Sequence, residues 1–208
     1  MRNFLRILHI SVLGLGLLTN VAAHADTGAA TKSVETLHAA LLAAMKQGGE
    51  QAGYKGRYTA LEPVITKCFD FGTIAKLVLG RNWAGLNPEQ QKKFVETFAK
   101  LSVATYASRF DSFSGEHFES LGETKQSGNN MLVNTQLVRT NDQPVSLNYL
   151  VSIGQDGSAR ILNVVADGVS DISLKRSEYG SIISSDGFDA LIEKLNAKIA
   201  QYESPSSK

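Results

Sequence analysis

The change in hydrophobic period after Gly115 constrains the fold more than any other feature of the chain. From His117 to Ala166, apolar and polar residues alternate, which is the pattern of strands with one buried face. Short turn sequences divide this region into four predicted strands, at about 117–125, 131–140, 145–153 and 159–166. Strands joined by such short turns pair with their neighbours in the chain. We therefore predict an antiparallel meander with one face packed on helices.

Helices are predicted before and after this meander in the chain. The clearest start signal is Asn87, an N-cap residue followed by Pro88 and by Gln90 at the position of a capping box. Before the meander, helices are predicted at about 33–47, 57–67, 69–79 and 88–113, and residues 26–32 are predicted to be a non-helical lead-in. After it, two more helices are predicted, one on either side of Asp186-Gly187. No repeat or linker divides residues 26–208. We predict a single α+β domain, with helices on one face of a curved, roughly four-stranded antiparallel sheet.

The N-terminus has the pattern of a secretory signal peptide. Arg2 and Arg6 flank the start of an apolar run that ends at the small-x-small sequence Ala23-His24-Ala25. We predict that residues 1–25 are removed and that the mature chain is soluble. The formal net charge then changes from +1 to −1, because two of the 21 basic residues leave while the 20 acidic residues stay. This balance argues against nucleic-acid binding.

The sequence offers little for catalysis or metal binding. It has no nucleophile elbow, phosphate loop or dinucleotide-binding fingerprint, so no cofactor is predicted. Cys68 is the only cysteine, which excludes an internal disulfide, and the isolated His38 and His117 do not make a metal site. One alternative is a small exported enzyme of cone-like α+β fold that uses a single buried acid or base. Its candidate residues are Asp70, Tyr106 and Tyr149.

The helix after Asn87 and the third strand carry more apolar surface than one packing contact needs. The predicted lining of a cavity between them is Phe98, Leu101, Val103, Tyr106, Val145, Leu147, Tyr149, Val151 and Val165. Such a lining would suit lipid tails, because two chains of about sixteen carbons gain on the order of 25 kcal/mol by leaving water. A solid core, as in a purely structural or docking module, would show the same pattern.

Three segments resemble those of a known family. They are FGTIAKLVLGRNW at 71–83, LNPEQQ at 86–91 with the helix that follows, and NVVADGVSDISLKRSEYGSIISSDGFDALIEKL at 163–195. In order and spacing they resemble the periplasmic lipid carriers of the MlaC type, an auxiliary component of ABC transport also linked to toluene tolerance. The stretches 103–118 and 170–179 also resemble the hopanoid-associated branch, often called HpnM. One departure is Asn163, where many relatives have Asp.

The resemblance implies a soluble periplasmic protein that holds the acyl tails of a phospholipid, or a hopanoid. It would carry this lipid between an outer-membrane lipoprotein complex and the substrate-binding component of an inner-membrane ABC transporter, in support of outer-membrane lipid asymmetry. The resemblance adds Leu79 and Trp83 to the predicted lipid-binding residues. Val169 joins them because it lies beside the predicted sharp turn at Gly168, and Val164 is a further candidate for the cavity wall or rim. The predicted docking residues are Arg81, Arg109, Lys175 and Arg176, with ordinary solvated cations as the alternative.

Overall fold

The computed structural model describes residues 27–47, 53–140 and 142–204, so the predicted signal peptide lies outside the described residues. In chain order the helices before the sheet are α1 (Thr27–Gln47), α2 (Gly53–Cys68), α3 (Phe71–Leu79), the 3₁₀ helix η1 (Gly80–Gly85) and α4 (Pro88–Arg109). The strands β1 (His117–Lys125), β2 (Asn130–Arg139), β3 (Asp142–Ile153), β4 (Ala159–Ala166) and β5 (Val169–Ser170) follow, and α5 (Asp171–Glu203) comes last. None of the helices in these ranges has the length and hydrophobicity of a membrane span.

The strands form one antiparallel sheet in the order β1-β2-β3-β4-β5. The register shifts within each of the three long pairings, the last of them at Leu150/Val151 against β4. Such irregularities bend strands and increase their twist, which curves the sheet. The predicted α+β class and the curved antiparallel meander are confirmed. The additional strand, β5, has only two residues and pairs with the end of β4.

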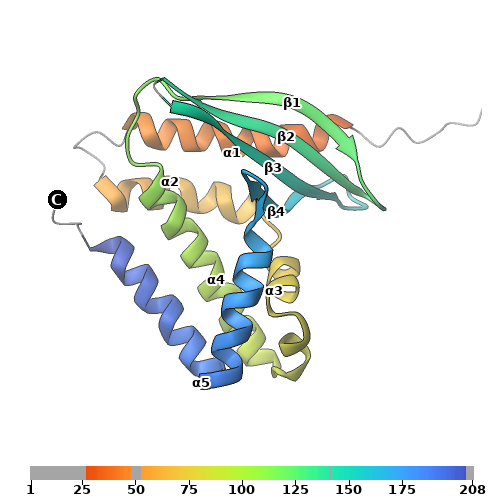
Figure 1. The fold of residues 1–208 in the computed structure, drawn as a ribbon, viewed down its shortest axis with the longest axis vertical. Coiled ribbons are helices and arrows are strands. Elements are labelled where there is room, and N and C mark those ends of the chain that lie inside the picture. The colour runs from red at the N-terminus through yellow and green to blue at the C-terminus, as the bar shows by residue number, and fades with distance from the viewer. Residues whose placement is uncertain (1–26, 48–52, 141, 205–208) are drawn as a thin grey trace, which may run out of the picture.

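The helices cover one face of the sheet. In Figure 1, α1 lies along the strands, α2 lies roughly parallel to α1 on its other side, and α4 and α5 extend away from the sheet on the same side. Val34, Leu37 and Leu41 of α1 are fully buried in one hydrophobic cluster with Val133 and Val151 of the sheet. The end of the sheet that carries Val151 is therefore filled by a solid core.

Local signals placed the start of α4 correctly. The Asn87 side chain accepts a hydrogen bond from the Gln90 backbone N–H at 2.9 Å, and the Gln90 side chain accepts one from the Asn87 backbone N–H at 3.1 Å. The prediction for α1 was wrong, because the helix already includes residues 27–32. Ser33, the first residue of the predicted helix, lies inside α1. Its hydroxyl donates to the Ala159 carbonyl of β4 at 3.0 Å and ties the helix to the sheet.

The C-terminal region has two sharp changes of direction. Asp167 and Gly168 both have positive φ, 47° and 81°, as in the two-residue turns that join antiparallel strands, and they connect β4 to β5. Gly187 interrupts α5 with a φ of 86° and a ψ of 176°, a conformation essentially restricted to glycine. The two arms of α5 are visible in Figure 1 and confirm the predicted break at Asp186-Gly187.

Candidate functional site

A cavity of about 720 Å³ lies between the sheet and the helices. Its walls come from the start of α3, one side of α4, the face of β2–β4 and the first turns of α5. Two of its apolar lining residues, Val169 and Leu174, are 50% and 59% exposed, so the cavity opens to solvent beside the start of α5. Its volume lies within the range of about 300–1,000 Å³ typical of small-molecule sites.

The sheet wall follows from strand alternation. Val145, Leu147 and Tyr149 are two residues apart on β3 and therefore share one face. The residues directly opposite them on neighbouring strands complete the wall: Leu137, Val164 and Ala166. Leu162 also lines the cavity, at the point where the β3–β4 register shifts.

The helical wall is rich in aromatic rings. Phe98 and Tyr106 of α4 line the cavity together with Phe69 and Phe71, which flank the start of α3. The ring centroids of Phe71 and Phe98 are 6.0 Å apart, and those of Phe69 and Tyr106 are also 6.0 Å apart. Aromatic contacts at these distances hold the wall in a defined shape. Most of the surface offered to a ligand here is carbon.

Seven of the twelve predicted lipid-binding residues line this cavity: Phe98, Leu101, Tyr106, Val145, Leu147, Tyr149 and Val169. Their role in binding stays a prediction. The other five require correction, because the structure places them outside the lining: Leu79, Trp83, Val103, Val151 and Val165.

The reasons for these corrections are geometric. Val165 pairs with Asn148, so it lies on the opposite face from Val164. Val103 follows Leu101 by two residues, about 200° around α4, and is buried on the helix's other side. Val151 shares the face of Tyr149 but is fully buried in the solid core.

Leu79 and Trp83 lie outside the cavity lining for a different reason, their place at the end of α3. Leu79 lines a separate cleft between η1 and α5, and Trp83 of η1 packs against the core. Sequence reasoning missed another group of lining residues: Met45, Phe69, Phe71, Ile74, Leu162 and Ile172. Only Phe69, Phe71 and Ile74 had a signal, the apolar run that becomes α3.

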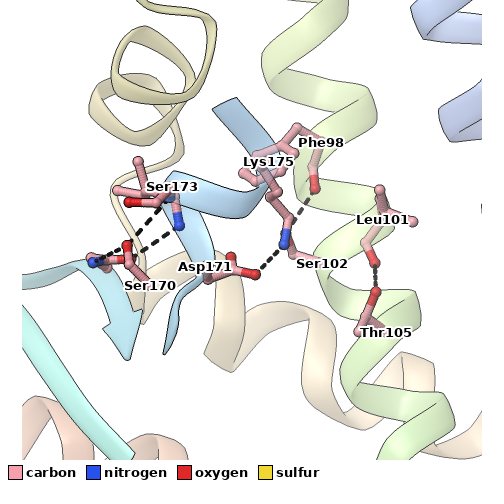
Figure 2. Close-up of polar contacts among 10 residues, drawn as sticks. Phe98, Leu101, Ser102, Thr105, Ser170, Asp171, Ser173 and Lys175 are labelled. Atoms are coloured by element: carbon pink, nitrogen blue, oxygen red, sulfur yellow. Dashed lines mark hydrogen bonds and ion pairs between the residues drawn. The ribbon is translucent and has the colours of Figure 1, made fainter. Parts of the chain in front are cut away.

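Polar side chains of α4 and α5 face one another at the cavity (Figure 2). Asp171 and Lys175, one turn apart on α5, form an ion pair. Ser102 and Thr105 lie on the facing side of α4, and each donates its hydroxyl hydrogen to a carbonyl of its own helix, at 2.9 Å and 2.8 Å. Arg109, in the last turn of α4, also lines the cavity.

The four predicted docking residues separate into two pairs. Arg109 and Lys175 line the cavity, whereas Arg81 and Arg176 line a second cleft of about 530 Å³ between η1 and α5. Arg176 donates from Nε and Nη2 to the Leu77 carbonyl at the end of α3. At least part of its guanidinium therefore serves to hold the two helices together.

A buried polar contact supports the cavity wall behind Tyr149. The Tyr149 hydroxyl lies 3.0 Å from Nε2 of His38 on α1, and the His38 ring stacks on Phe118 with 3.7 Å between centroids. Burial lowers the pKa of His38 from 6.5 to about 4, so the ring is neutral near pH 7. His38 is thus a satisfied buried histidine that orients a cavity residue.

The residues proposed for an enzyme have other roles in the structure. Asp70 is the N-cap of α3, and its carboxylate accepts from the backbone N–H and the hydroxyl of Thr73 at 2.9 Å and 2.7 Å. Burial raises the pKa of both Tyr106 and Tyr149, which disfavours the tyrosinate that a base would require. The three side chains supply capping and cavity walls.

Asn163, the departure from the family pattern, organises the connection to α5. Its side-chain amide donates to the Ser170 hydroxyl at 3.0 Å and accepts from the Ile172 backbone N–H at 3.2 Å. The Ser170 hydroxyl in turn caps α5 by accepting from the Ser173 backbone N–H. An ionised aspartate could accept but not donate, so the amide suits the hydroxyl that it meets here.

Comparison with known proteins agrees with this geometry. The model of the family described as MlaC protein matches residues 35–197. The chain belongs to the MlaC family. This confirms the family suggested by the three sequence segments, while the hopanoid-associated branch stays a prediction.

The chain is also similar to one individual protein in sequence and to another in fold. The chain is 25% identical, over 127 residues, to the intermembrane phospholipid transport system binding protein MlaC of Haemophilus influenzae. The match covers 60% of this chain and 59% of that protein's length. The fold is that of a phospholipid-binding protein from Ralstonia solanacearum whose structure holds a phospholipid: the TM-score is 0.72 at 19% identity, over 86% of this chain and 98% of the other.

Proposed function

We propose that this protein is a soluble periplasmic lipid carrier that holds the acyl tails of a phospholipid in the cavity between sheet and helices. The observation that carries the proposal is the cavity of about 720 Å³, lined mainly by aliphatic and aromatic side chains and open at one side. An open apolar cavity costs a protein packing energy, so it is kept where a ligand fills it. The MlaC family membership supports this reading.

The physical demand on such a carrier is to match the dryness of the membrane. Two tails of about sixteen carbons lose on the order of 25 kcal/mol if they enter water. A lining of carbon atoms keeps the tails out of water and so avoids this cost. Only the headgroup needs to meet polar groups near the opening. The half-exposed Val169 and Leu174 would provide the apolar border over which the tails pass.

The place of this carrier in the cell follows from the predicted signal peptide and from its relative. Removal of residues 1–25 would leave one lipid-binding domain, 26–208, in the periplasm. The Haemophilus influenzae protein is named for intermembrane phospholipid transport. We propose that this chain likewise exchanges lipid between an outer-membrane complex and an inner-membrane ABC transporter, as a carrier and not as an enzyme.

Native mass spectrometry of protein purified from the periplasm tests the ligand. We expect a complex heavier than the protein by one phospholipid, identified after solvent extraction. A hopanoid in its place would assign the chain to the second branch. Protein that stays empty in the presence of phospholipid vesicles would refute the carrier function.

Leu147→Asp places a carboxylate in the sheet wall and should remove the bound lipid from most molecules. Asn148→Asp is the matched control, because Asn148 is the next residue of β3 and lies on the opposite face. We expect this control to retain lipid. Equal lipid occupancy in both variants would show that the tails do not contact this wall.

A further inference from the structure

The cavity contains two polar regions of different character. In the first, beside the β2–β3 turn, Arg139 is partly engaged: Nη1 pairs with Asp142 at 2.8 Å and Nη2 donates to the Gln143 carbonyl at 3.0 Å, while the buried Nε has no hydrogen-bond partner among the described residues. Glu116 in the same region accepts from the Ser114 backbone N–H at 2.6 Å. These groups serve the local structure of the turns.

The second region lies between α4 and α5 and has cationic donors to spare. Lys175 Nζ uses one of its three hydrogens on Asp171, and Arg109 is absent from the ion pairs found among the described residues. With Asp171 included, these three side chains carry a net charge of +1. Ser102 and Thr105 donate to their own helix and therefore offer lone pairs as acceptors.

Lys175 differs from an ordinary surface lysine. Its side chain is 24% exposed, compared with 77% for Lys92, which forms a similar one-turn ion pair on α4. Its Nζ lies 6.0 Å from the centre of the Phe98 ring, so the aliphatic stem follows the aromatic wall while the ammonium stays at the polar region. Figure 2 shows Asp171 and Lys175 facing the part of α4 that carries Ser102.

We propose that Lys175 binds the phosphodiester group of the lipid, with Asp171 holding the ammonium in place and Arg109 as a second donor. This inference rests on the proposed function and goes beyond it, because it assigns the headgroup end of the ligand. The phosphodiester carries one negative charge and matches the net charge of the region. The acceptor oxygens of Ser102 and Thr105 would meet the hydroxyl or ammonium groups of a glycerol or ethanolamine headgroup.

The test compares two lipids with identical tails, dioleoyl phosphatidylglycerol and dioleoylglycerol. Each displaces a fluorescent acyl probe from delipidated mature protein. Lys175→Gln should weaken phosphatidylglycerol binding by about tenfold and leave dioleoylglycerol binding unchanged. Lys175→Arg should restore most of the loss. Lys92→Gln, the matched control, should change neither affinity, and thermal unfolding should show that all variants are folded.

Several outcomes would overturn the assignment. If Lys175→Gln weakens both lipids equally or neither, the lysine is a structural residue. If sn-glycerol 3-phosphate alone binds saturably and Lys175→Gln abolishes this, the site takes a soluble phosphate and not a lipid headgroup. If the wild-type protein binds both lipids equally, the headgroup site is refuted but the carrier function is not. Wild-type protein that binds neither refutes the carrier function as well.

Discussion

Protonation of His38 should destabilise the fold at moderately acidic pH. The imidazole is buried between Phe118 and Tyr149, and its pKa falls from 6.5 in the unfolded chain to about 4 in the folded protein. The unfolded state therefore binds more protons in this window. Above about pH 6.5, His38 does not lower the free energy of unfolding. As the pH falls from about 6.5 to about 4, the free energy of unfolding decreases, and below about pH 4 the stabilisation from the neutral imidazole is fully lost.

The magnitude follows from the two pKa values. Their difference corresponds to about 3 kcal/mol, and most of it, about 2–3 kcal/mol, should be lost between pH 7 and pH 4.5. Urea unfolding of the wild type and of His38→Gln at both pH values isolates this term, because the carboxylates titrate in both proteins. We expect the wild type to lose about 2–3 kcal/mol more than the variant.

The control for this experiment is His117→Gln. His117 lies on β1 with its side chain 54% exposed, outside the buried contact between His38 and Tyr149, so its removal should not reproduce the effect of removing His38. If wild type and His38→Gln lose the same free energy of unfolding between pH 7 and pH 4.5, the imidazole is protonated without cost and is not buried against Tyr149 and Phe118.

Two further predictions concern the kink in α5 and the border of the cavity. Gly187→Ala should destabilise the protein by about 1–3 kcal/mol, because the backbone conformation of Gly187 disfavours a Cβ. Gly180→Ala should instead stabilise it by about 0.5–1 kcal/mol, because Gly180 is helical and has open space around it. Calorimetric unfolding that gave stability changes of the same sign for both variants would contradict this. Leu174→Ser should slow lipid uptake from vesicles about fivefold, which is the equivalent of about 1 kcal/mol of lost apolar contact. Leu121→Ser is the control and should not slow uptake, because Leu121 is equally exposed, at 59%, but lies outside the cavity. Equal uptake rates in a fluorescent transfer assay would argue against lipid passage over Leu174.

Sequence reasoning succeeded where the determinants are local. The capping box at Asn87 and Gln90 involves residues three apart, and its hydrogen bonds form as predicted. Alternation along β3 placed Val145, Leu147 and Tyr149 on one face, because side chains on a strand point to opposite sides in turn. The same reasoning predicted the antiparallel meander and the helical break before Gly187.

Sequence reasoning failed where the answer depends on distant segments. Val164 and Val165 are both apolar, and only the pairing of β4 with β3 decides that Val164 faces the cavity. Whether an apolar face meets solid core or open space depends on where α1 ends its contact with the sheet, which separates the buried Val151 from the cavity residue Leu147. No local pattern encodes that boundary.

The sequence by itself determined most of the elements, the α+β class and the family, because periodicity, capping and motif order are written within short segments. Only the tertiary structure decided the shape of the cavity and the position of its polar groups. Lys175 and Arg81 are alike in sequence as basic residues near helix ends, yet packing places one beside Phe98 in the cavity and the other in a separate cleft. That difference arises from the way α5 lies across α3 and α4, a long-range property of the folded chain.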